Sequence, residues 1–402
     1  MIVSIRNWFL LLALIIWASP SLAASLPIGL SINASGDNAQ YSLDFKNGVD
    51  AFVTASSTKK RFGKSRLELV AMEDMGQPER FYANSKRLIK HKGVLALLTN
   101  HNLKAMPKAV DIAAKYKTLL LTTNPYSSDY SLRELEALGF LSNSEANMLK
   151  PAERLLEQAN QVYLISEQAE LSFPWYQALS KATEQPVYQH TQSQLNLLSK
   201  LSNSLFVLAL DQVDSARLAL DILTSNSNSN VLILPQTDTR LLANAINHKL
   251  EPQQLARLYY LNAAPLHLEE LPLVKKFKQD MLAFNPQANL SHQALKGYLL
   301  ASLVAESIFH STKGLKTESF LDVVTLPFQV LDQMVGWVKH SGSDISSSEV
   351  LDTFARMKNF DAGLHKAVSV GEDRVLLGDT WLTQVDPQGR LIQASFANGR
   401  QF

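Results

Sequence analysis

The sequence contains no cysteine and no excess of charge of either sign. Without a thiol the chain can form no disulfide, offer no thiolate to a metal ion and carry no lipid on a cysteine. It has 38 lysine and arginine residues against 37 aspartate and glutamate residues. Proteins that bind nucleic acids usually show a basic excess, because neutralising phosphates supplies much of their affinity. We therefore expect no nucleic-acid partner.

Motifs of common enzymes are also missing. There is no Gly-x-Ser-x-Gly turn to hold a nucleophile, the 9 histidines include no His-x-x-x-His pair, and the 16 glycines are dispersed instead of forming a phosphate-binding loop. We therefore expect no catalytic residue, no metal site and no cofactor. An enzyme remains the third hypothesis, which a panel of hydrolytic assays would test.

The first residues carry the pattern of an export signal. Arg6 precedes an apolar run over residues 8–18, and Pro20 and the sequence Ser21-Leu22-Ala23 follow. The run is shorter than the roughly 20 residues that span a bilayer. We expect residues 1–23 to be a signal peptide, cleaved near Ala23, and the mature protein to lie free in the periplasm. An uncleaved membrane anchor is the alternative.

Short apolar runs then alternate with longer stretches of helical spacing. The runs cover residues 28–32, 67–72, 94–98, 118–121, 162–165, 205–210 and 231–234. Such runs are typical of buried parallel strands, so the alternation predicts an α/β fold of doubly wound parallel sheets. In the first helix we expect Phe45 and Val49 to face the sheet and Asp44 to lie on another face.

The length favours two such units. About 380 residues remain after residue 23, which is too many for one ordinary core. No low-complexity linker divides them, so we expect two lobes built from interleaved segments. Pro235 and Asn124-Pro125 mark sharp turns after two of the expected strands. Ligands of open α/β sheets bind at such carboxyl ends.

Several motifs, in colinear order, resemble those of leucine/isoleucine/valine-type periplasmic binding proteins. The opening matches in its strand, loop and first helix, over residues 28–31, 35–41 and 44–48, and the likeness continues over residues 67–74, 77–84 and 92–97. Residues 273–284 with 297–301 are similar to the family's late helix pair, and residues 360–364 with 382–391 to its closing β region. The likeness is strongest over residues 28–125 and is one of topology alone over residues 140–260.

This resemblance implies two parallel-sheet lobes joined by a hinge that closes on a ligand. One lobe would contain residues 24–135 plus 263–365, and the other residues 136–262 plus 366–402. The segment 315–348, with Trp337, is longer than the family has at that place. It is expected to be an added helix and loop, either a docking surface or a simple insertion.

The resemblance also implies where the first lobe would hold a ligand. Tyr41 stands where the family has an aromatic residue that covers the ligand, although a buried helix-capping role is equally open. Hydroxyl and amide donors after the third and fourth strands would hold a carboxylate. These donors are expected from Asn100, His101, Asn102, Thr122, Thr123 and Asn124. His101 could instead be an exposed loop residue.

The second lobe departs from the family pattern. At the place of the family's acidic residue, which binds the ligand's ammonium group, this chain has Gln236. Glu145 or Asp211 would take over that role, or both are surface charges. The family therefore implies a binding protein that passes a small organic molecule (an amino acid, an amide or a small carboxylate) to the membrane permease of an ABC importer, acting as a monomer. The alternative is a sensory or scaffolding protein of the same fold that partners a membrane receptor.

Overall fold

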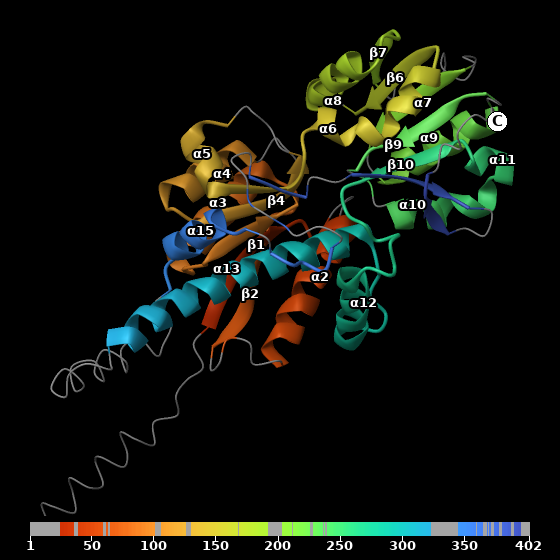
Figure 1. Cartoon of the computed structure of the whole chain (residues 1–402). Helices are drawn as coiled ribbons and strands as arrows, with labels where there is room; N and C mark the ends of the chain where they lie inside the picture. Colours follow the sequence, from red (N-terminus) through yellow and green to blue (C-terminus); the bar gives the residue numbers. More distant parts are fainter. Residues whose placement is uncertain are drawn as a thin grey trace, which may run out of the picture.

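The structure is a computed structural model (Figure 1). It describes residues 25–35, 39–58, 62, 65–100, 106–125, 130–167, 169–191, 203–210, 212–225, 228–235, 237, 239–322, 345–358, 360–364, 368, 370, 374–377, 380–386 and 390–394. A few residues in these ranges, among them Asn124 and residues 312–320, are described by their backbone alone. The expected signal peptide and residues 323–344 of the expected insertion lie outside the described residues.

The first sheet has six described strands, each parallel to its neighbours, in the order β11-β5-β4-β3-β1-β2. They are β1 (Ser25–Ile32), β2 (Arg66–Glu73), β3 (Ala96–Thr99), β4 (Leu119–Pro125), β5 (Leu138–Ser142) and β11 (Val375–Leu377). One face is covered by α2 (Ala39–Thr58), α12 (Pro272–Phe284), α13 (His292–Asp322) and α15 (Ser347–Ala355). The other face is covered by α3 (Pro78–His91), α4 (Met106–Lys115) and α5 (Leu132–Ala137).

The second sheet has seven described strands in the order β13-β12-β10-β9-β8-β6-β7. The parallel strands are β6 (Gln161–Ser166), β7 (Val187–Thr191), β8 (Ser204–Ala209), β9 (Asn230–Ile233) and β10 (Leu258–Asn262), and the antiparallel ones are β12 (Trp381–Val385) and β13 (Leu391–Gln393). One face packs on α9 (Gln212–Ser225), α10 (Thr239–Ile246) and α11 (Pro252–Leu255). The other packs on α6 (Glu145–Met148), α7 (Glu153–Gln158) and α8 (Ala169–Ala182). Short 3-10 turns are η1 (Lys150–Ala152) and η3 (Asn247–Lys249).

The predicted α/β fold is confirmed, and each of the seven predicted apolar runs forms a strand. Strand β4 shows why these runs are apolar throughout. Leu119 and Leu121 point into the core beneath α2 and α13, whereas Leu120 between them points into the core beneath α3 and α4. A strand buried on both faces has no solvent side on which polar residues would alternate.

Asp44, expected on another face of the first helix than Phe45 and Val49, is itself buried. Only 1% of it is exposed. Its Oδ1 accepts hydrogen bonds from Gln40 Nε2 at 2.6 Å and from Asn289 Nδ2 at 3.5 Å. The carboxylate is therefore stabilised inside the protein by amide donors, one of which comes from a segment far away in the sequence.

Each sheet together with its helices forms one lobe. The chain passes three times between the two lobes. It leaves the first sheet after β5 to enter α6, returns after β10 to enter α12, and passes from β11 to β12 near the end. β5 and β11 both lie in the first sheet, beyond the lobe boundaries expected at residues 135 and 365. Hydrogen-bonded pairing of β5 with β4 and with β11 fixes this arrangement.

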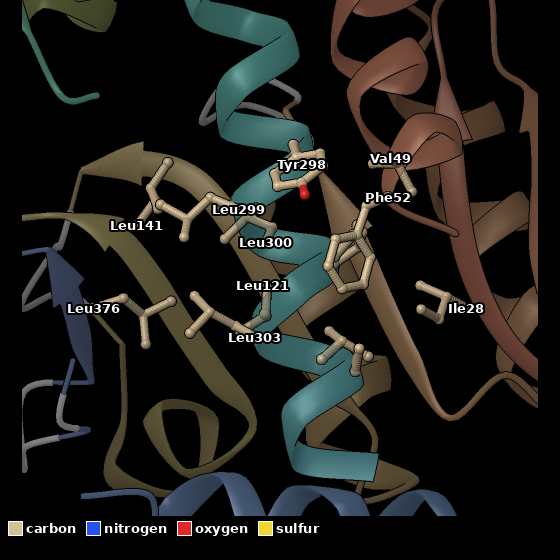
Figure 2. Close-up of a cluster of buried hydrophobic side chains, with 14 of the residues drawn as sticks. Ile28, Val49, Phe52, Leu121, Leu141, Tyr298, Leu299, Leu300, Leu303 and Leu376 are labelled. Atoms are coloured by element: carbon tan, nitrogen blue, oxygen red, sulfur yellow. The ribbon is translucent and has the colours of Figure 1, made fainter. Parts of the chain in front are cut away.

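Helix α13 is the central element of the first lobe. It crosses α2 so closely that a methyl group added to Gly297 would lie 2.1 Å from the carbonyl oxygen of Phe45. Beside this crossing the rings of Phe52 and Tyr298 meet edge to face, with centroids 5.2 Å apart. Figure 2 shows leucines of α13 between Phe52 and the strands of the first sheet. Two glycines, Gly48 and Gly297, thus allow the helix to pack as a second layer over the sheet.

Candidate functional site

The carboxyl ends of the parallel strands in both sheets lie where the chain passes between the lobes. The first crossing leaves β5 at its carboxyl end, Ser142, and the second leaves β10 at its carboxyl end, Asn262. Parallel strands all end at the same edge, so both sheets direct their carboxyl ends toward this region. We call it the junction, defined by the strand ends at residues 99–100, 122–123, 142, 235 and 262.

The first lobe contributes buried hydroxyl and amide groups to the junction. Thr99 and Thr122 are direct partners in the register of β3 and β4, so their side chains point to the same face on strands that lie about 4.8 Å apart. Both are fully buried, and Thr123 is nearly so. Asn100 follows β3, and its Nδ2 donates to Ser42 Oγ on α2 at 3.5 Å. The structure thus brings three of the predicted donors together at one edge.

Of the remaining predicted residues, two are described with their side chains and five are not. Tyr41 lies half-buried in the first turn of α2, inside the helix and not in the loop before it. Glu145 is the first residue of α6, half-buried, directly after the first crossing. The side chain of Asn124 is not described, and His101, Asn102, Asp211 and Gln236 lie outside the described residues.

The neighbouring edge of β1 and β2 is closed by its own hydrogen bonds. Ser31 Oγ donates to Asp74 Oδ2 at 2.6 Å, and Gly76 N donates to Asp74 Oδ1 at 2.8 Å. Asn84 Nδ2 reaches Ser31 Oγ at 3.2 Å. These polar groups stabilise the turn after β2.

The polar start of α13 was not identified from the sequence. His292, Gln293 and Lys296 are all buried, the last with 3% exposed. Lys296 Nζ donates to the carbonyl oxygen of Pro235, at 3.3 Å, directly after β9 of the second lobe. A sequence signal did exist, since these residues occupy positions i, i+1 and i+4 on one face of a helix whose next turns are apolar.

The segment after β10 completes the described junction. Asn262 Nδ2 donates to Thr383 Oγ1 of β12 at 2.8 Å. Farther along, His267 Nε2 lies 3.1 Å from Gln393 Oε1 of β13, and burial holds the pKa of His267 below its usual value. The hydrogen bond to Gln393 and the charge of Glu270 act in the opposite direction. The crossing is therefore fastened to the antiparallel edge of the second sheet.

A separate groove of about 1170 Å³ lies on the outer side of the first lobe. We call it the outer groove. It is lined by Phe52 of α2, by α12, α13 and α15, and by residues 356–358 and 360–363. Helix α13 contributes Tyr298, Ser302, Glu306, His310 and Ser311. None of the donors predicted from β3 and β4 lines it. The outer groove and the junction are therefore different surfaces of the first lobe.

Within the described part of the chain no cluster of histidine, aspartate and glutamate side chains has the geometry to hold a metal ion. A helix with the length and apolarity needed to cross a membrane is likewise not found there.

No protein-family model and no curated protein sequence matches the chain. Solved structures do. A possible leucine/isoleucine/valine-binding protein from Rhodopirellula baltica has a TM-score of 0.71 and 17% identity, over 95% of this chain and 99% of that one. LivJ of Streptococcus pneumoniae, a branched-chain amino acid transporter substrate-binding protein solved with isoleucine, has a TM-score of 0.70 and 13% identity, over 91% and 97%.

LivK of Thermotoga maritima, a leucine-binding protein, has a TM-score of 0.69 and 12% identity, over 92% of this chain and 98% of that one. Such low identities with nearly complete coverage show a shared fold. The chain has the fold of the type I periplasmic binding proteins, as its resemblance to leucine/isoleucine/valine-type proteins predicted.

Proposed function

We propose that the protein is a periplasmic solute-binding protein, which captures an amino acid, an amide or a small carboxylate between its lobes for an ABC importer. The observation that carries this proposal is the pair Thr99 and Thr122, in register at the carboxyl ends of β3 and β4, beside Asn100. Solved structures of the same fold support it, because LivJ was solved with isoleucine and LivK is a leucine-binding protein.

The chemistry of the junction suits a polar organic ligand. Hydroxyl and amide groups held by neighbouring strands can replace the water lost by a carboxylate or an amide, because their positions are fixed before the ligand arrives. A hinge at the three crossings would let the second lobe add contacts and exclude water. The amide of Gln236, the predicted residue after β9, cannot neutralise an ammonium group as a carboxylate would. An amide or a carboxylate therefore fits the donors as well as an amino acid does.

Export is part of this proposal. The signal pattern over residues 1–23 directs the chain to the periplasm, and the lack of cysteine leaves no thiol for a lipid anchor. Comparing the mass of the mature protein from the periplasmic fraction with the mass of the full chain would test cleavage near Ala23. Full-length protein retained in the membrane fraction would contradict it.

Ligand binding is tested by thermal shift against amino acids, amides and small carboxylates, together with native mass spectrometry of protein purified without denaturation. A ligand present at 100 times its Kd stabilises the folded state by about 2.7 kcal/mol, which the shift in Tm reports. We expect one chemical class to stabilise the protein. No stabilisation across the whole library, with no bound metabolite in the mass spectrum, would refute the proposal.

The site is tested with a matched pair of variants on one strand. Thr122→Val removes a hydroxyl at the carboxyl end of β4, whereas Thr118→Val removes one just before the amino end; both residues are fully buried. We expect Thr122→Val to weaken binding of the identified ligand about tenfold, the effect of one hydrogen bond to a charged group, and Thr118→Val to leave it unchanged. Equal effects of the two variants would place the ligand elsewhere.

A sensory or scaffolding role with a membrane receptor is the second candidate. It is favoured by the direct hydrogen bond between Lys296 and Pro235, which joins the lobes with protein groups alone. In this case the purified protein would hold no metabolite. A defined membrane receptor would bind the protein, and no compound of the library would change its affinity.

A further inference from the structure

Lys296, in the first lobe, donates a hydrogen bond to the backbone of a strand end in the second lobe. Its Nζ donates to the carbonyl oxygen of Pro235 at 3.3 Å, and only 3% of the residue is exposed. Hydrogen bonds from a charged donor in a buried setting are stronger than those between neutral groups. This contact joins the two lobes in addition to the three crossings of the chain.

The two ends of this hydrogen bond are firmly held. Lys296 directly precedes Gly297, at the close crossing of α13 with α2. On the other side, Leu234 N donates to Leu208 O of β8, at 3.1 Å, so the chain before Pro235 is still part of the sheet. A rotation that moves these two backbone segments apart by more than the lysine side chain can follow therefore lengthens or breaks the bond.

We propose that Lys296 is a positioning residue that stabilises the closed arrangement of the two lobes by holding the end of β9 against the first lobe. Opening exposes its ammonium group to water and releases the carbonyl of Pro235. Closure keeps Pro235, at the end of β9, against the first lobe, on the side of the donors of β3 and β4. Only this last step, from closure to ligand affinity, rests on the proposed function.

The test measures the distance between the lobes without any ligand. The chain has no native cysteine, so one pair of introduced thiols can be spin-labelled cleanly. Glu79→Cys in α3 and Glu157→Cys in α7 place exposed labels on different lobes. The distance between the labels in this protein is compared with the distance in the same labelled protein that also carries Lys296→Met. This substitution keeps the length of the side chain but removes the charge and the donors.

Lys46→Met is the matched control, because Lys46 is also a lysine of the first lobe, but it pairs with Asp50 on its own helix. We expect Lys296→Met to lower the ratio of closed to open molecules about tenfold, which is observed as a shift to longer distances between the labels. Lys46→Met should leave the distances unchanged. Unchanged distances in Lys296→Met, or the same change in both variants, would overturn the proposal.

Hydrogen exchange gives a second readout that does not depend on labels. We expect amides at the end of β9 to exchange faster in Lys296→Met, with the centre of the sheet unaffected. Uniformly faster exchange would indicate general destabilisation and would count against the proposed positioning role of Lys296. A failed ligand screen would leave both readouts intact, so the failure of this inference and that of the proposed function can be told apart.

Discussion

Helix α13 has polar side chains in two places, and their surroundings differ. At the junction, Lys296 is buried and donates to the other lobe. In the outer groove, Glu306 pairs with His310 one turn along the same helix, with 3.0 Å between Nε2 and Oε1. A movement of one lobe against the other would change the partner of Lys296, whereas Glu306 and His310 would move together with their helix. The proposed closure should therefore affect the junction and leave the outer groove unchanged.

The outer groove has a second internal network at its other end. The hydroxyl of Tyr298 accepts from Lys276 Nζ at 2.9 Å and donates to Asp280 Oδ2 at 2.6 Å. Lys276 and Asp280 also pair with each other on α12. The polar groups of the groove thus join α12 to α13 within the first lobe, which predicts that they contribute to its stability and not to closure.

The substitution with the largest expected effect should disrupt both the junction and the outer groove. In Gly297→Val the new side chain would overlap the backbone of α2, since even its first carbon would lie 2.1 Å from the carbonyl oxygen of Phe45. We expect the free energy of unfolding to fall by about 3 kcal/mol, the upper part of the usual cost of overpacking, measured by urea denaturation. Ser302→Ala, on the same helix, is the control and should cost much less. A loss below about 1 kcal/mol in Gly297→Val would show that α2 and α13 can separate without cost.

The next effect concerns the junction alone. Asn262→Leu removes the donor to Thr383 Oγ1 at the second crossing and leaves a buried hydroxyl without it. We expect a loss of about 2 kcal/mol in the free energy of unfolding. The double variant with Thr383→Val should recover part of this loss, because both polar groups are then absent. Strictly additive losses would mean that the two side chains do not interact.

Much of the fold could be predicted because burial leaves a simple pattern. Each of the seven apolar runs became a strand, since a strand covered on both faces is apolar at every position. β5, β7, β10 and β11 were not predicted. β7, with the sequence Val187–Thr191, lies at the sheet edge and is only partly buried, so its residues are largely polar. Edge strands lose the signal on which the prediction depended.

The positions of candidate residues were predictable only at strand ends. Asn100, Thr122 and Thr123 could be placed because the carboxyl ends of parallel strands lie at one edge of a sheet. Lys296 could not, because its partner Pro235 is 61 residues away in the sequence and belongs to the other lobe. The burial of Asp44 was not predicted for the same reason, since Asn289, one of its donors, comes from a distant segment. Contacts between distant segments leave no local pattern.

A smaller effect is expected from the outer groove. Tyr298→Phe removes the hydroxyl between Lys276 and Asp280 without changing the packing of the ring. We expect a loss of about 1.5 kcal/mol in the free energy of unfolding, as for a hydrogen bond to a charged group, and unchanged distances between the lobes. Tyr188→Phe, whose side chain is exposed, is the matched control and should have little effect. A change in lobe distance in Tyr298→Phe would contradict the separation of the two surfaces.

The smallest effect is a pH dependence that belongs to the junction. Burial lowers the pKa of His267, so the folded state keeps this imidazole neutral at a pH where the unfolded chain, with a value near 6.5, already binds a proton. The stability that His267 contributes is therefore present above about pH 6.5 and is lost as the pH falls toward the folded pKa. Urea denaturation at about pH 7.5 and pH 5.5 should show a smaller loss on acidification in His267→Gln than in the wild type, while His248→Gln, at an exposed position, should match the wild type. Because His267 lies between Gln393 and the ring of Trp381, its protonation should loosen the crossing and leave the outer groove unchanged. The same pH dependence in His267→Gln and wild type would instead place the acid-sensitive group elsewhere.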